Sequence, residues 1–167
     1  MSNDLLLDQQ FMQQALAQGQ LAYDAGEVPV GAIVVLDGEV IGRGFNQPIS
    51  QLDPSAHAEI VAIRDAAKAV GNYRLSGATL YVTVEPCAMC AGCLVHARIG
   101  RVVYGTTEPK AGVVESAMTF FESDFLNHKV EADSGVLAQE AADLMSSFFK
   151  MRRAGKKKLK ELNRSTK

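Results

Sequence analysis

The sequence predicts a single α/β domain built on a mixed β-sheet with helices on both faces. Two strand-like runs flank Asp37-Gly38, a dipeptide typical of tight hairpin turns, so one strand pair should be antiparallel. A strand, helix and strand pattern over residues 78–105 predicts a parallel pair joined by a right-handed crossover. Amphipathic helical patterns near both ends of the chain would supply the covering layers.

The first half of the chain begins with a helical pattern, in which apolar residues recur at helical spacing over residues 8–25. The apolar run 31–36 is typical of a strand buried on both faces, and residues 39–46 return from the turn as its partner. The dipeptide Asp53-Pro54 then predicts the start of a second helix, which should stop near Gly71.

The second half of the chain continues with two β-rich runs, residues 78–84 and 101–105, which we interpret as strands. Between them, Glu85-Pro86 marks the start of a short helix over residues 87–97. Residues 129–132 fit an edge strand, whereas the segment before them gives no clear pattern.

The C-terminal part of the chain predicts one more amphipathic helix, from Leu137 to about Arg153, with Gly155 fraying its basic end. Nine Lys or Arg residues and one acid follow from residue 150 onward, although the net charge of the chain is -2. We therefore expect a domain over residues 1–153 and a flexible basic tail over 154–167. Basic tails often meet nucleic acid or membrane, but charge alone equally allows a tail that only aids solubility.

Composition restricts the class of protein. With 167 residues, 47% hydrophobic and 22% charged, the chain has the size and composition of one globular domain. Its longest apolar run, Val30–Leu36, is far shorter than the roughly 20 residues that span a bilayer. The first residues contain no basic start of the kind that signal peptides have, so we expect a cytoplasmic protein without membrane association.

The cysteines point to a metal site. Cys87, Cys90 and Cys93 lie within seven residues, and an odd, clustered set without an export signal argues against a disulfide framework. Two cysteines three apart at a helix start project their sulfurs from one side, where the helix N-terminus favours thiolates. With His57 as third ligand, they could hold Zn²⁺ and leave the fourth position for water, the pattern of catalytic sites.

A glutamate follows the histidine at a spacing that suits proton transfer. Glu59 is not needed as a ligand and can take the proton of a water on the metal. Alone, C-x-x-C or H-x-E is a weak signal, but H-x-E together with P-C-x-x-C is the signature of zinc deaminases. Cys93 could still be a fourth ligand of a structural site, although we interpret it as a small buried apolar residue. His96 and His128 lack such partners, and we interpret them as structural.

With these motifs, the sequence resembles the bacterial tRNA-specific adenosine deaminases of the cytidine deaminase-like superfamily. The resemblance covers residues 8 to 153. Its matching segments are EVPVGA (27–32), DPSAHAE (53–59), NYRL (72–75), LYVTVEPCAMCAG (80–92), RIGRVV (98–103), NH (127–128) and FFKMRR (148–153).

The resemblance implies a three-layer α/β/α sandwich around a five-stranded sheet, present as a homodimer. It implies hydrolytic deamination of the wobble adenosine to inosine in the anticodon loop of a tRNA, chiefly an arginine tRNA. The residues that match the family's functional positions are His57, Cys87 and Cys90 as ligands of one Zn²⁺ per subunit, Glu59 as proton shuttle, and Asn46, Glu108, Lys110, Phe149, Arg152 and Arg153 as substrate contacts.

Some of these assignments have alternatives. An Asn such as Asn46 also commonly ends a strand at a turn, and relatives often carry Asp in place of Glu108. The same motif core occurs in deaminases of free cytidine or guanine. A non-catalytic RNA-binding module with structural zinc is the third alternative, which replacement of Glu59 would distinguish.

Overall fold

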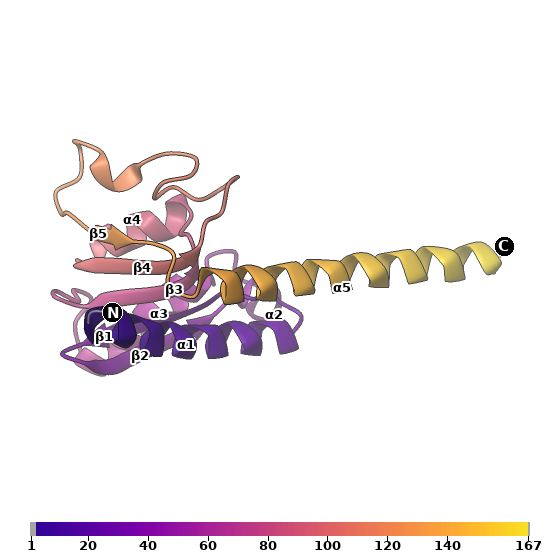
Figure 1. Ribbon diagram of the computed structural model, residues 1–167, viewed down its shortest axis with the longest axis horizontal. Coiled ribbons are helices and arrows are strands. Elements are labelled where there is room, and N and C mark those ends of the chain that lie inside the picture. The colour runs from indigo at the N-terminus through magenta and orange to yellow at the C-terminus, as the bar shows by residue number, and fades with distance from the viewer. Residues whose placement is uncertain (1–2, 167) are drawn as a thin grey trace.

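The centre of the molecule is a five-stranded mixed sheet in the order β2-β1-β3-β4-β5, seen in a computed structural model that describes residues 3–166 (Figure 1). The strands are β1 (Gly31–Leu36), β2 (Glu39–Phe45), β3 (Thr79–Val84), β4 (Arg101–Thr106) and β5 (Glu131–Asp133). The first four agree with the predicted strands to within one or two residues. The fifth begins two residues later than predicted.

The strand pairing follows the prediction. β1 pairs with β2 antiparallel, and the backbone φ angles of 51° at Asp37 and 78° at Gly38 fit the predicted two-residue hairpin turn. β1 also pairs antiparallel with β3, whereas β3 with β4 and β4 with β5 are parallel. The sheet is therefore mixed, and the carboxyl ends of β3 and β4 lie at one edge.

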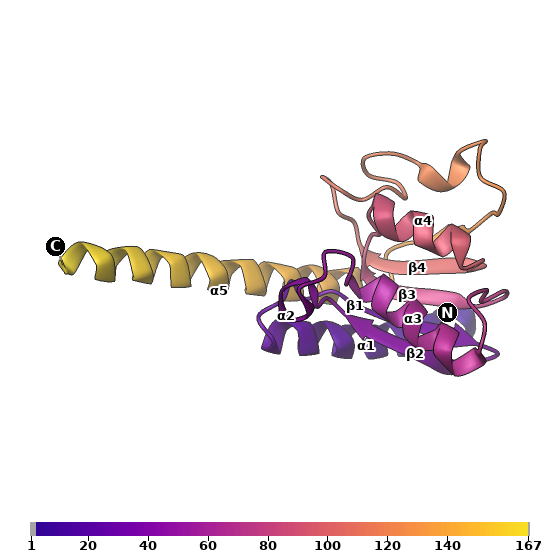
Figure 2. The ribbon, with the colours of Figure 1, turned by 180° about the vertical axis from the view of Figure 1, so that it is seen from behind.

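Helices cover both faces of the sheet, which confirms the predicted three-layer arrangement. α1 (Asn3–Asp24) and the first half of α5 (Ala138–Ser165) lie on the face turned to the viewer in Figure 1. Figure 2 shows α3 (Ala58–Val70) and α4 (Ala88–His96) on the opposite face. Two short pieces complete the fold: α2 (Pro48–Gln51) and a 3₁₀ turn over Phe120–Glu122.

The core consists of two apolar clusters, one on each face of the sheet. Ile33 and Val35 of β1 pack under α1, while Ala32 and Val34 point to the side of α3 and α4. The prediction that this strand is buried on both faces is thus confirmed. On the α3 side, Gly44 of β2 lies so close to the α3 backbone that a Cβ would overlap it. This close contact fixes the first turn of α3 against the sheet.

Two predicted helix starts are wrong. α1 begins at Asn3 instead of residue 8, because its first turn is exposed at Leu5, Leu6 and Leu7 and so has no core-facing pattern to reveal it. α3 begins at Ala58 and not at Asp53-Pro54. The Asp53 carboxylate accepts hydrogen bonds from the amide and the hydroxyl of Ser55, at 2.8 and 2.7 Å, which closes a local turn in place of capping a helix.

The predicted end of the last helix is also wrong, since α5 continues through Gly155 to Ser165. A single glycine costs about 1 kcal/mol in a helix interior, and the lysine- and leucine-rich residues around it are good helix formers. Residues 154–165 are exposed and project away from the body of the molecule (Figure 1). The division at residue 153 into a domain and a flexible tail stays a prediction.

Within the described residues, no helix is both long enough and apolar enough to pass through a bilayer.

Candidate metal centre

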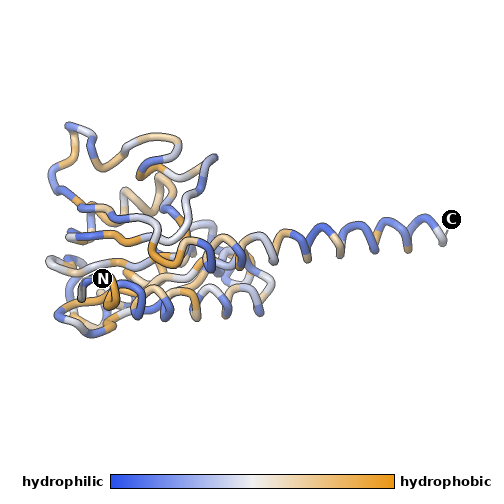
Figure 3. The backbone as a smooth tube through the Cα atoms, in the orientation of Figure 1, coloured by the Kyte–Doolittle hydropathy of each residue, from blue (hydrophilic) through white to orange (hydrophobic). Residues whose placement is uncertain are grey.

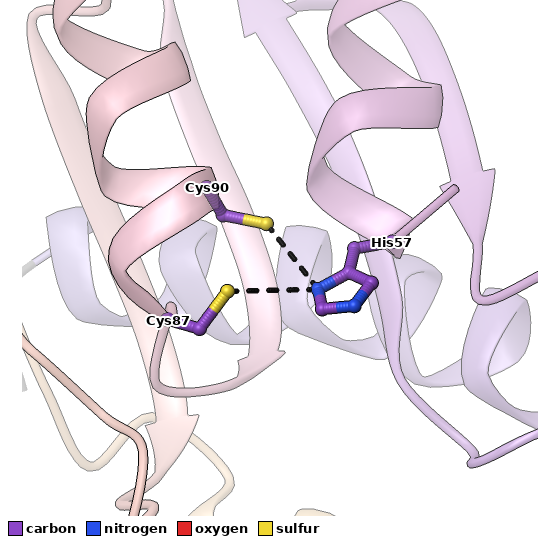
Figure 4. Close-up of side chains that lie close together, drawn as sticks. All are labelled: His57, Cys87 and Cys90. Carbon is purple, nitrogen blue, oxygen red and sulfur yellow. Dashed lines mark hydrogen bonds between the residues drawn. The ribbon is translucent and has the colours of Figure 1, made fainter. Parts of the chain in front are cut away.

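The two cysteines of the predicted site lie at the start of α4. β3 ends at Val84, and the chain passes through Glu85 and Pro86 to Cys87, which caps α4 as its N-cap residue. Cys90 is in the first turn of the helix and fully buried, while Cys87 is half-buried. Because the two cysteines are three positions apart in the sequence, both sulfurs point to the same side, as Figure 4 shows.

The histidine comes from the neighbouring helix. His57 is the N-cap residue of α3 and faces the two sulfurs (Figure 4). Its Nδ1 lies 3.6 Å from the sulfur of Cys87 and 3.6 Å from that of Cys90. The sequence places the three ligands in two segments about thirty residues apart, and the fold brings the starts of two helices together.

The spacing of these three atoms fits a metal ion. All three ligand atoms lie within 4.8 Å of one another. A tetrahedral zinc with Zn–S of about 2.3 Å and Zn–N of about 2.05 Å would place nitrogen and sulfur about 3.6 Å apart. The measured distances agree with that value, and two thiolates with one imidazole are a zinc-type donor set. Cys93 is not part of this group and packs against the core instead.

The pKa values of the two thiols are shifted in opposite directions. A hydrogen bond from Cys90 lowers the pKa of Cys87 to about 4 although burial opposes it, and the same bond together with burial raises the pKa of Cys90. The hydrogen bond to Cys87 raises the pKa of His57. These shifts favour a thiolate at Cys87, and a divalent cation would favour a thiolate at Cys90 as well.

Glu59 lies one residue into α3 and is almost fully buried, at 3% exposed. Burial raises the pKa of Glu59 to about 7, a backbone hydrogen bond lowers it, and the nearby Cys87 thiolate raises it further. A carboxyl group with a pKa near neutrality can both accept and donate a proton at the working pH of an enzyme. Its position beside the ligand cluster therefore suits general acid–base chemistry.

Asn46 is also at the site. It follows β2 directly, and its Oδ1 accepts a hydrogen bond of 2.8 Å from the backbone N–H of Ala58 at the start of α3. This bond fixes the amide plane beside His57. Among the described residues, the other end of the amide, Nδ2, has no hydrogen-bond acceptor, so it is available as a donor.

The remaining predicted substrate residues are not brought onto the ligand cluster. In the loop that follows β4, Glu108 turns its carboxylate back onto the amide of Ala111, and Lys110 is exposed. On α5, Phe149 is 42% exposed and Arg153 is exposed. The guanidinium of Arg152 lies 5.4 Å from the ring centre of Phe148.

Two buried carboxylates near the site are not among the predicted functional residues. Glu27 is 2% exposed and holds the loop after β2 by accepting bonds from the amides of Ile49 and Ser50. Glu85 is 4% exposed and holds the loop after β4 in the same way. Both stand outside the helices and strands, and the sequence alone does not identify their partners.

Comparison with known proteins shows the family of this chain. A family model described as MafB19-like deaminase matches residues 7–153. A tRNA-specific adenosine deaminase of Haemophilus influenzae is 48% identical over 159 residues, which are 95% of this chain and 92% of that protein. This chain belongs to the tRNA-specific adenosine deaminase family. A tRNA-specific adenosine deaminase of Bacillus subtilis is 42% identical, over 92% of this chain and 98% of that one.

Solved structures of this deaminase family and its neighbours have the same fold. One structure, from a study of A-to-I editing by tRNA:A34 deaminases at the wobble position, has a TM-score of 0.79 and 46% identity. It covers 81% of this chain and 98% of its own. A guanine deaminase from Nitrosomonas europaea has a TM-score of 0.74 at 18% identity, covering 89% of this chain and 93% of its own, which shows the shared fold alone. The predicted deaminase fold is confirmed, and the chain is an enzyme of this family.

Proposed function

We propose that this enzyme converts the wobble adenosine of a tRNA, chiefly an arginine tRNA, to inosine by hydrolytic deamination. The relatives that are 41–48% identical are tRNA-specific adenosine deaminases, which supports this substrate. The structural observation that carries the chemistry is the buried carboxyl of Glu59, with a pKa of about 7, beside three atoms spaced for one zinc ion.

His57, Cys87 and Cys90 would hold one Zn²⁺ per subunit. When bound, such an ion supplies a water whose pKa is lowered to about 7. Glu59 would be the proton acceptor for such a water and the proton donor to ring nitrogen 1 of adenine. Because Glu59 is buried, its carboxyl is held away from bulk water, so the proton passes to the substrate.

Asn46 would orient the base. An enzyme of this kind acts on a base taken out of its stack, which needs a donor or acceptor at the pocket wall. The bond from the Ala58 amide fixes Oδ1, so Nδ2 is the group directed to a ring nitrogen of the purine. A loop base costs least to extrude, which favours an anticodon loop over a duplex.

The rest of the anticodon arm would contact α5 and the loop after β4. The exposed Phe149 can stack on a base, and Arg152 and Arg153 can pair with phosphates. Arg152 also contacts the carbonyl of Gly26, at 3.5 Å, which ties this part of α5 to the loop next to Glu27. We assign Glu108 and Lys110 to the opposite side of the substrate, in the loop after β4.

The homodimer and the cytoplasmic location that the resemblance and the composition imply remain part of this proposal. Sedimentation of the purified protein would measure the first, and cell fractionation the second.

The function can be tested by incubating zinc-loaded protein with an arginine tRNA transcript and sequencing it before and after. Inosine is read as a change from adenosine to guanosine at the wobble position. Glu59→Ala should retain zinc and lose turnover, because the metal ligands are intact while the proton shuttle is gone. Turnover of free adenosine, cytidine or guanine without change in the tRNA would contradict the proposal.

A further inference from the structure

Glu85 occupies the junction between the candidate metal centre and the loop that follows β4. It is the residue after β3 and lies two residues before Cys87. Its backbone N–H donates to the carbonyl of Thr106, the last residue of β4, at 2.9 Å. The main chain of Glu85 is therefore part of the sheet, although the carboxylate is turned into the loop.

The carboxylate is an acceptor for one whole stretch of this loop. Oε2 accepts bonds of 3.0, 3.0 and 3.1 Å from the amides of Val114, Glu115 and Ser116. Oε1 accepts a bond of 3.1 Å from the amide of Glu108 and another from the hydroxyl of Ser116. Residues 107–117 contain no helix or strand, so these bonds take the place of regular secondary structure.

The packing of the loop is built around the same group. At Gly112 a Cβ would overlap the carboxylate of Glu85, so only glycine lets the backbone close over it. The next amide, that of Val113, donates to the carbonyl of Pro86 at 3.0 Å. The loop thus folds over the segment 85–86 and buries Glu85 to 4% exposed.

This loop also carries two of the proposed substrate residues, Glu108 and Lys110. Glu108 is bonded to Glu85 through its own amide, and its carbonyl closes a turn by accepting from Gly112 at 2.9 Å. The buried carboxylate of Glu85 therefore fixes several backbone groups of the segment that carries both side chains.

We propose that Glu85 is a positioning residue that fixes the loop 107–117 in the conformation that receives the RNA around the target base. The inference rests on the proposed function. Glu85 is outside the candidate ligand group and acts by holding the backbone of Glu108 to Ser116. Replacing the carboxylate oxygens of Glu85 should weaken substrate binding while the metal ligands stay in place.

The test compares Glu85→Gln with Asp8→Asn in the zinc-loaded, full-length enzyme. The first substitution keeps the size of the side chain but presents an amide N–H₂ to groups that are themselves donors. Asp8 is the matched control, since it is also a buried carboxylate bonded to Arg101 and Tyr81, but at the amino ends of β3 and β4. Zinc content, amide exchange of the loop, and kcat and KM for the tRNA are measured for each variant.

We expect Glu85→Gln to retain zinc, to speed amide exchange at residues 108–117 about tenfold or more, and to raise KM for the tRNA about tenfold with a smaller change in kcat. Asp8→Asn should change neither the exchange nor KM. If Glu85→Gln does not fold, Ser116→Ala removes one donor from the loop side and should cause a smaller shift of both quantities in the same direction.

Three results would overturn the proposal: unchanged loop exchange and KM in Glu85→Gln, equal effects in Asp8→Asn, or loss of zinc as the main effect. A parent enzyme that does not modify tRNA would contradict the proposed function instead. In that case the exchange measurement still decides whether Glu85 holds the loop.

Discussion

Removing residues 154–167 should weaken tRNA binding and reduce its dependence on salt, without changing zinc content. This segment continues α5 as an exposed helix to Ser165 and projects away from the body of the molecule in Figure 1. Successive residues of an α-helix rotate by about 100°. Lys156, Lys157, Lys160 and Arg164 therefore fall on one face within an arc of about 100°, and the apolar Leu159 and Leu162 lie on the other side.

The size of the effect follows from this geometry. The first and last of the four cations are eight positions apart in the sequence, or about 12 Å along the helix axis. If three of them neutralise phosphates, they contribute about 2 to 3 to the slope of log K against log salt. A fourfold rise in salt would then weaken the parent about 20- to 40-fold more than the truncated protein. Figure 3 shows this projecting half of α5 as mainly hydrophilic, with a few apolar positions.

The assay is filter binding of the tRNA between 50 and 200 mM salt, about the range over which such slopes are measured. Both proteins carry Glu59→Ala, so that the substrate is not converted during the experiment. Lys160→Gln lies on the basic face and should lower the slope by about 0.7 to 0.9, whereas Lys158→Gln lies off that face and should leave it unchanged. An unaltered slope after truncation, or equal losses in the two lysine variants, would refute the reasoning.

Three further predictions concern the metal centre and the sheet. Cys90→Ser should lower the zinc content of dialysed protein, measured by elemental analysis, to a small fraction of the parent's. Cys93→Ala should leave the zinc content unchanged. Zinc retained by Cys90→Ser would contradict the ligand set. Gly44→Val should force the first turn of α3 off the sheet and cost about 1–3 kcal/mol, measured by urea unfolding, with unchanged stability as the contrary result. Burial would raise the pKa of Asp8, but the hydrogen bonds from Arg101 and Tyr81 outweigh burial and lower that pKa below 3.8. Asp8→Asn should therefore lower the free energy of unfolding by about 2–4 kcal/mol at pH 7. This difference should shrink as the pH falls below 3.8 and through the lower folded-state pKa of Asp8. A constant difference down to pH 3 would argue against this ion pair.

The elements that the sequence predicts well are those with a local signal. The β1–β2 hairpin depends on Asp37-Gly38, and the start of α4 depends on Pro86 followed by the two cysteines, so both are confirmed closely. Helix ends were predicted less well, because they depend on competing local bonds. Asp53 is a residue type that is common at helix N-caps, but its carboxylate bonds Ser55 and α3 begins only at Ala58.

The candidate site divides in the same way. The ligand residues and Glu59 are predicted by short motifs, since their spacing within one helix turn already sets their geometry. Glu85 and Glu27 could not be found from the sequence, because their partners lie more than twenty residues away in loops without a periodic pattern. The contact of Arg152 with Gly26 is likewise formed only by the folded chain.

The two halves of the chain meet at the imidazole of His57 and the sulfurs of Cys87 and Cys90, which begin two helices packed on the same side of the sheet. An ion captured there would act as a cross-link between these helices, and binding energy of this kind adds directly to the free energy of unfolding. A cellular shortage of the ion would thus shorten the lifetime of the folded protein as well as abolish its activity.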